Sequence, residues 1–169
     1  TWHSDRTEED EPPTWPGPTA DELDALDALG AKGTWTLQGR DLKLTNLDKV
    51  LFPGEDGPPL TKRDLIRFYT EVAPVLLPHL KDRPLTLTRY PNGVAGDLFY
   101  QKHYAQPIPD FVDTVKIWST SNNVEGEYIL CNNLPTLVWL AQIADLEIHA
   151  WMARIDPEPD AHGRTTTFS

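Results

Sequence analysis

Two lysines and an asparagine stand just before and at the start of a predicted helix, where they could bind an anion. Asn46 and Lys49 precede the N-cap pattern of Thr61 and Asp64, and Lys62 is the first residue after that cap. A helix N-terminus presents unpaired N–H groups and a positive dipole end, to which lysines add charge. The pattern alone leaves two interpretations open, an anion pocket or ordinary surface cations.

A second segment combines cationic and aromatic residues over a short distance. Arg89 stands before Tyr90 in a strand-like run, and the adjacent aromatics Phe99 and Tyr100 precede Lys102. Adjacent side chains on a regular strand face opposite ways, so both aromatics could meet the same ligand only from an irregular loop. The alternative is that these aromatics belong to the hydrophobic core.

A third candidate is the run that contains Asp145, Glu147 and His149. If this run is extended, the three side chains share one face. Oxygen and imidazole ligands together are typical of a metal site. The alternative is a capped or solvated strand edge, which the sequence equally allows.

The hydrophobic pattern predicts the elements that position these residues. We expect a short helix from Asp21 to Leu29, a hairpin around Gly39, and a helix after Thr61 that Pro74 and Pro78 kink or end. Strands are predicted over residues 85–90, 98–103, 115–118 and 128–131, and a buried helix over 134–143 with Asn132 or Asn133 as its cap. Strands and helices interleave, so the predicted fold class is α+β, or mixed α/β.

Composition divides the chain into three parts. Residues 1–33 form an acidic, proline-rich tail with a possible short helix, in which residues 1–18 are expected to be disordered. Residues 34–155 form the folded module. Residues 156–169 are a proline-rich loop or a truncation point.

Charge and cysteine content limit the classes of protein. A single cysteine excludes an intrachain disulfide, and the lack of a long apolar run or signal sequence predicts a cytoplasmic protein with no membrane partner. The net charge of −11 argues against nucleic acid as a partner. The distribution of charge along the chain does not argue against nucleic acid, because residues 40–103 hold ten basic and eight acidic residues.

These segments together resemble the polymerase and primase domain of bacterial ATP-dependent DNA ligase D, within the archaeo-eukaryotic primase superfamily. The resemblance covers residues 34–155 and rests on residues 44–53 with 61–64, residues 83–93, residues 99–103 and residues 140–151. It implies the N-terminal module of a primase-polymerase fold, a sheet with flanking helices, incomplete in this chain. In that family a complete domain is nearly twice as long.

The resemblance also implies roles for individual residues. In the family, certain positions receive a 5'-phosphate or contact DNA. The residues that match these positions in this chain are Asn46, Lys49, Lys62, Arg89, Phe99, Tyr100 and Lys102. The two aromatics would stack on template bases, an interaction of about 1 to 3 kcal/mol per base. His149 would bind the nucleoside triphosphate or the reacting 3' end, and Glu147 would be structural. Many relatives have lysine where this chain has Thr88.

One part of the family pattern has no counterpart in this sequence. The complete domain holds Mg²⁺ or Mn²⁺ on an Asp-x-Asp pair after the histidine, where this chain continues Asp156-Pro157-Glu158-Pro159-Asp160. We therefore expect no catalytic residue, no tightly bound metal and no nucleotidyltransferase activity in this chain alone. Whether the natural protein continues past Ser169 stays open.

The function implied is that of an end-joining repair polymerase, present as a fragment that recognises 5'-phosphorylated DNA ends. In its complete form the domain would also take nucleoside triphosphates and meet a ligase and end-binding proteins, in association with the nucleoid. Two alternatives stay open. The chain could be a non-catalytic module for binding DNA ends, or an interaction or structural protein that uses its acidic tail and aromatics.

Overall fold

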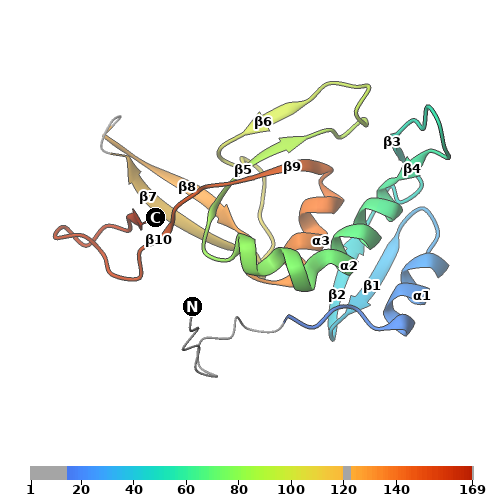
Figure 1. Cartoon of the computed structure of the whole chain (residues 1–169), viewed down its shortest axis with the longest axis horizontal. Coiled ribbons are helices and arrows are strands. Elements are labelled where there is room, and N and C mark those ends of the chain that lie inside the picture. The colour runs from blue at the N-terminus through green and yellow to red at the C-terminus, as the bar shows by residue number, and fades with distance from the viewer. Residues whose placement is uncertain (1–14, 120–122, 169) are drawn as a thin grey trace, which may run out of the picture.

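Strand β5 (Pro84–Arg89) is the centre of a five-stranded sheet. The computed structural model describes residues 15–119 and 123–168 of the chain. Along one edge, β5 pairs with β6 (Phe99–Gln101) and with β8 (Val124–Leu130). Along the other edge it pairs with β9 (Asp145–Ala150). Strand β8 also pairs with β7 (Asp113–Ser119). All these pairings are antiparallel, and Figure 1 shows β7 and β8 extending away from the rest of the sheet.

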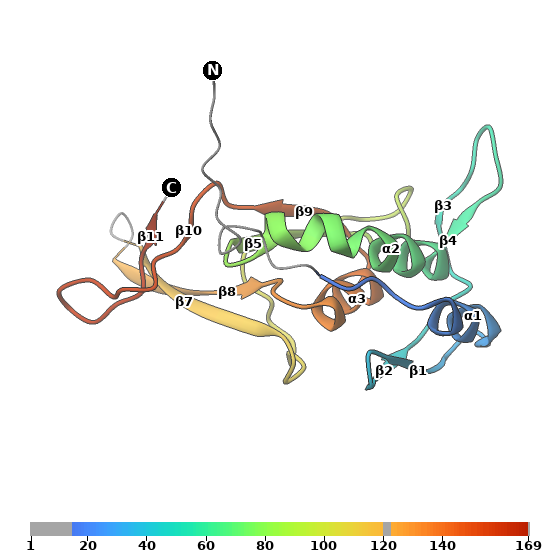
Figure 2. The same ribbon diagram turned by 60° about the horizontal axis from the view of Figure 1, so that its bottom comes forward.

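Helices α2 (Lys62–Leu80) and α3 (Leu134–Gln142) pack against each other and supply the core on one face of this sheet. Leu85 and Leu87 of β5 lie in one buried cluster with residues of both helices, including Leu77 and Leu137. Figure 2 shows α2 alongside β9, with α3 on the same side of the molecule as α1. The alternate β5 residues are polar and face the other side of the sheet.

Helix α2 continues through Pro74 and Pro78 to Leu80. Of the two expected effects of these prolines, a kink or an end, the end is therefore wrong. Each internal proline removes one backbone hydrogen bond and costs roughly 3 kcal/mol. The face that carries Ala73, Leu77 and Leu80 is buried, and this burial offsets the loss. Tertiary packing therefore sets the length of the helix.

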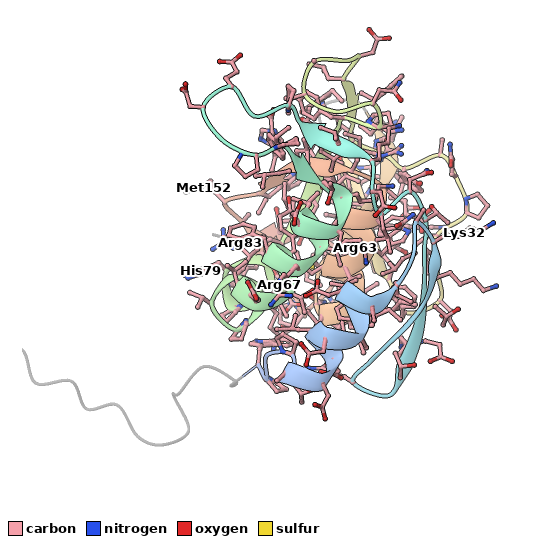
Figure 3. All side chains as sticks on the ribbon, turned by 90° about the vertical axis from the view of Figure 1, so that its right-hand side faces the viewer. Lys32, Arg63, Arg67, His79, Arg83 and Met152 are labelled. Atoms are coloured by element: carbon pink, nitrogen blue, oxygen red, sulfur yellow. The ribbon has the colours of Figure 1, made fainter. Side chains whose placement is uncertain are left out.

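The N-terminal elements pack on the start of α2. Helix α1 (Ala20–Ala28) begins at a capping box made by Thr19 and Glu22, and Leu26 is fully buried. Arg63 donates to the Leu26 and Leu29 carbonyls, and Arg67 pairs with Asp27. Figure 3 shows Arg63 and Arg67 on the side of α2 that faces α1.

The predicted hairpin is confirmed. Strands β1 (Gly33–Leu37) and β2 (Arg40–Leu44) pair in register, and the two-residue turn has φ of 49° at Gln38 and 75° at Gly39. Positive φ at both central residues matches the twist of a hairpin, which is why glycine is suited to this turn.

Two small ribbons complete the fold. Strand β3 (Val50–Phe52) pairs with β4 (Leu60–Thr61), and β10 (Arg154–Ile155) pairs with β11 (Thr167–Phe168). The combination of helices with antiparallel sheets confirms the expected mixed fold class. The first 14 residues of the expected disordered tail lie outside the described residues. In the part of the chain that is described, no helix is long and apolar enough to cross a membrane.

Candidate functional site

The loop before α2 lies against the first residues of the helix. The Lys62 backbone N–H donates to the Lys49 carbonyl at 2.9 Å, and that of Arg63 donates to the Leu47 carbonyl at 3.0 Å. Asn46 stands at the bend of this loop with φ of 55°, a conformation that asparagine tolerates better than most residues. The structure thereby brings Asn46, Lys49 and Lys62 to one end of α2.

Lys62 is a buried cation. Its exposed fraction is 6%, and among the described residues its ammonium group has no hydrogen bond and no ion pair. Burial lowers the pKa of Lys62 to about 8, and the neighbouring charges of Lys49 and Arg89 act in the same direction. An ammonium group without a hydrogen bond, at the end of a buried side chain and beside two other cations, is a site that an anion would stabilise.

Arg89 reaches this cluster from the end of β5. Its guanidinium donates to the Ile143 carbonyl at 2.9 Å and to Gln101 Oε1 at 3.2 Å, and it lies over the Tyr104 ring at 5.4 Å. These partners are uncharged. They fix the direction of the side chain while its positive charge stays available to the cluster.

Asn92 joins the cluster from the loop that follows β5. The Lys49 ammonium donates to Asn92 Oδ1 at 2.8 Å. The loop is anchored on β3, where the Val94 N–H donates to the Leu51 carbonyl at 2.8 Å. Gly93 has φ of 82°, and a Cβ there would lie 2.9 Å from the Leu51 carbonyl oxygen, so close approach of the two backbones requires glycine. No local pattern in the sequence signals the contact between Lys49 and Asn92.

A second group of polar side chains lies on the face of the sheet opposite the helices. The register places Thr88 between Tyr100 of β6 and Glu147 of β9, and places Thr86 opposite His149. Side chains of paired residues in neighbouring strands point to the same face. Tyr100, Thr88, Glu147 and His149 therefore form one continuous surface.

Hydrogen bonds link this surface. The Tyr90 hydroxyl donates to Glu147 Oε1 at 2.5 Å, and Glu147 Oε2 lies 3.3 Å from His149 Nε2. Thr88 Oγ1 is 3.2 Å from the same nitrogen. The Tyr100 ring meets the His149 ring edge-on, with 6.4 Å between centroids.

Asp145 does not share the face of Glu147 and His149, so that expectation is wrong. The pairing of β5 with β9 shifts by one residue between Thr88 and Arg89, and this bulge turns Asp145 into the interior. Asp145 is fully buried, and neither carboxylate oxygen has a hydrogen-bond partner. Burial raises the pKa of Asp145 to about 8, against the opposing effects of the Thr88 backbone and the charge of Arg89.

Phe99 and Tyr100 lie on a short regular strand instead of an irregular loop. Both are exposed, at 50% and 59%, but strand alternation turns them to opposite faces. Tyr100 faces His149, and Phe99 is paired with Arg89. Lys102 follows the strand and is exposed.

Comparison with known proteins assigns the family. The family model for the primase-polymerase domain of LigD matches residues 61–167. The chain belongs to the LigD primase-polymerase family. The resemblance on which the sequence interpretation rests is thus confirmed.

Relatives of this LigD-type chain are longer proteins. It is 35% identical over 120 residues to the multifunctional non-homologous end joining protein LigD of Mycolicibacterium smegmatis, and the match covers 70% of the chain and 15% of that protein. It is 38% identical over 108 residues to the bifunctional non-homologous end joining protein LigD of Bacillus subtilis, covering 64% of the chain and 16% of that protein.

A solved structure is similar in fold. The polymerase domain of Mycobacterium tuberculosis ligase D, determined in complex with DNA, aligns with a TM-score of 0.65 and 34% identity. The alignment covers 75% of this chain and 42% of that one. The chain thus spans less than half of the solved polymerase domain.

The metal ions expected for the complete LigD domain find no fitting site among the described residues. No group of three or more His, Cys, Asp or Glu side chains in residues 15–119 and 123–168 could hold a metal ion. Glu147 and His149 are adjacent, but the bulge turns Asp145 away from them. The roles expected for individual residues stay predictions.

Proposed function

We propose that this chain recognises a 5'-phosphorylated DNA end, as part of a polymerase domain that acts in non-homologous end joining. The observation that carries the proposal is Lys62, a buried lysine side chain whose ammonium group has no anionic partner among the described residues. It stands at the first turn of α2, beside Lys49 and Arg89.

A terminal phosphate suits this site better than a backbone phosphate. It carries a second negative charge near neutral pH and projects beyond the duplex, so it can reach a recessed ammonium. The positive end of the α2 helix dipole adds to the charge of the lysines, while the N–H groups of Lys62, Arg63 and Asp64 are already engaged within the chain. Lys49 and Asn46 lie at the same end of α2, and a charge-assisted contact to phosphate is stronger than a neutral one.

The sheet face opposite the helices would receive the rest of the substrate. Tyr100 would stack on a base there and Phe99 on a base at the opposite face of β6. Lys102 would contact the DNA backbone, and His149 would bind the incoming nucleoside triphosphate or the 3' end. The complete domain would add nucleotides with Mg²⁺ or Mn²⁺, beside a ligase and end-binding proteins at the nucleoid. The names of the relatives, which refer to end joining, and the DNA complex of the similar polymerase domain support this assignment.

The chain alone would bind ends without transferring nucleotides. In the described residues the carboxylates do not converge on a metal site, and Glu147 is engaged by Tyr90 and His149. This second candidate function, a non-catalytic end-binding module, differs from the first only in the reaction step. A primer-extension assay separates the two.

The test of end recognition compares two DNA substrates that differ only in the terminal group. Lys49→Ala and Lys62→Met are each expected to weaken binding to a recessed 5'-phosphorylated end about tenfold, and binding to the same end with a 5'-hydroxyl much less. Methionine fills the buried space of Lys62 without charge. Lys116→Ala, which removes an exposed lysine of β7, is the matched control.

Equal losses on both substrates would assign these lysines to nonspecific attraction and overturn the proposal. Melting temperatures of all variants, measured in parallel, show whether a loss of binding comes from loss of fold.

A further inference from the structure

We propose that Glu147, held by Tyr90, is a positioning residue that commits Nε2 of His149 to the protein and leaves Nδ1 as the ligand-facing atom. The proposal rests on the proposed role of His149 toward a nucleotide. Beyond that role, it specifies which ring nitrogen of His149 meets the ligand and which residues determine the choice.

The geometry places two oxygen atoms at one nitrogen. His149 Nε2 lies 3.3 Å from Glu147 Oε2 and 3.2 Å from Thr88 Oγ1. Among the described residues, no hydrogen bond engages Nδ1 of His149. The imidazole is about half exposed, so a ligand can approach that nitrogen.

The charge of Glu147 decides which nitrogen carries the proton. An ionised carboxylate only accepts hydrogen bonds, so an unprotonated Nε2 would place a lone pair against it. The Tyr90 hydroxyl donates to Glu147 Oε1 at 2.5 Å, which holds the carboxylate beside the ring. The N–H group therefore belongs on Nε2, where Glu147 and Thr88 share it.

Tyr90 is suited to its part as a permanent donor. Its hydrogen bond to Glu147 raises the pKa of the Tyr90 hydroxyl above its ordinary value, with burial and the charge of Glu147 acting in the same direction. The hydroxyl thus keeps its proton near neutral pH and remains a donor to Glu147. The remaining neighbour, the Tyr100 ring at 6.4 Å, presents an edge and carries no charge there.

Nδ1 of His149 can bind a ligand whether the ring is neutral or protonated. When His149 is neutral, Nδ1 accepts a hydrogen bond and suits a sugar hydroxyl of a nucleotide. When the ring is protonated, Nδ1 donates and suits a phosphate oxygen. In either state Glu147 keeps the ring from turning Nε2 toward the ligand.

The first test reads the tautomer directly, by ¹⁵N NMR of the imidazole at alkaline pH, with His149→Gln to assign the signals. We expect the Nε2–H form in the unaltered chain and a mixture of both tautomers in Glu147→Ala. Tyr90→Phe should shift the ratio in the same direction by less. Glu125→Ala, which removes an exposed carboxylate of β8, should leave the tautomer unchanged.

The second test measures binding of ATP as the probe. Glu147→Ala should weaken binding about fivefold, and the same substitution in a His149→Gln background should have no further effect, because Glu147 acts through His149. An Nδ1–H tautomer in the unaltered chain, or the same tautomer in Glu147→Ala, would overturn the proposal. Absence of ATP binding together with the expected tautomers would instead overturn the nucleotide role proposed for His149.

Discussion

The ammonium group of Lys49 donates a hydrogen bond to Asn92 Oδ1 at 2.8 Å, which ties the loop before α2 to the loop after β5. The residues are 43 positions apart in the chain. Because the amide of Asn92 is uncharged, it orients Lys49 without cancelling its charge. The contact makes Asn92 part of the proposed phosphate pocket.

Asn92→Asp is expected to weaken binding of a 5'-phosphorylated end about tenfold, since the new carboxylate would pair with Lys49 and repel the phosphate. Asn92→Ala removes only the orienting contact, so its loss should be about threefold or less. Fluorescence anisotropy on 5'-phosphate and 5'-hydroxyl duplexes measures both. Should the two variants lose affinity equally, the charge at position 92 would be irrelevant to the pocket.

The pH dependence of end binding should follow Lys62. Its pKa is lowered to about 8, chiefly by burial, so the ammonium loses its proton as the pH rises through that value. The phosphate keeps its charge over the same range. The preference for a 5'-phosphorylated end over a 5'-hydroxyl end should therefore decline about tenfold between pH 7 and pH 9.

Lys62→Met supplies the control for this pH effect. The variant lacks the titrating group, so its weaker preference should not change over the same interval. A decline that persists in Lys62→Met would assign the titration to another group.

Asp145 should make the stability of the fold depend on pH. Its folded-state pKa is raised from 3.8 to about 8 by burial, so the folded chain keeps a proton that the unfolded chain releases. The free energy of unfolding must then fall as the pH rises from about 4 to about 8, with a limiting slope of about 1.4 kcal/mol per pH unit. Asp145→Asn, which cannot ionise, should lack this component.

Urea unfolding of both proteins at several pH values measures the difference. The advantage of Asp145→Asn should grow toward pH 8 and level off above it. A difference that is constant with pH would mean that Asp145 is solvated or paired in the folded protein.

Local structure follows closely from the sequence. The cap of α2 at Thr61, the cap of α3 at Asn133 and the hairpin turn at Gly39 are each specified by residues a few positions apart. The lysines at the start of α2 could be predicted to lie at a helix N-terminus because helix polarity is a local property, while their role as an anion site stays a prediction.

Non-local structure could not be predicted in the same way. The contact of Asn92 with Lys49 depends on how β5 and β3 are placed by the whole core. The inward turn of Asp145 depends on a bulge that appears only when β9 pairs with β5. Continuation of α2 past Pro74 reflects burial of its last turns, against local propensity.

The isolated 169-residue chain should not extend a DNA primer with any nucleotide in Mg²⁺ or Mn²⁺. Nucleotidyl transfer requires carboxylates that bridge two metal ions, and lysines and one histidine cannot replace them. The nearest exposed carboxylate to His149 is Glu147, which Tyr90 already engages. Denaturing gels of a labelled primer, with a competent polymerase as positive control, provide the measurement.

His149→Gln, purified in parallel, identifies contamination, since extension equal in both samples does not come from this chain. Extension that the unaltered chain supports and His149→Gln abolishes would show that it holds catalytic metals after all.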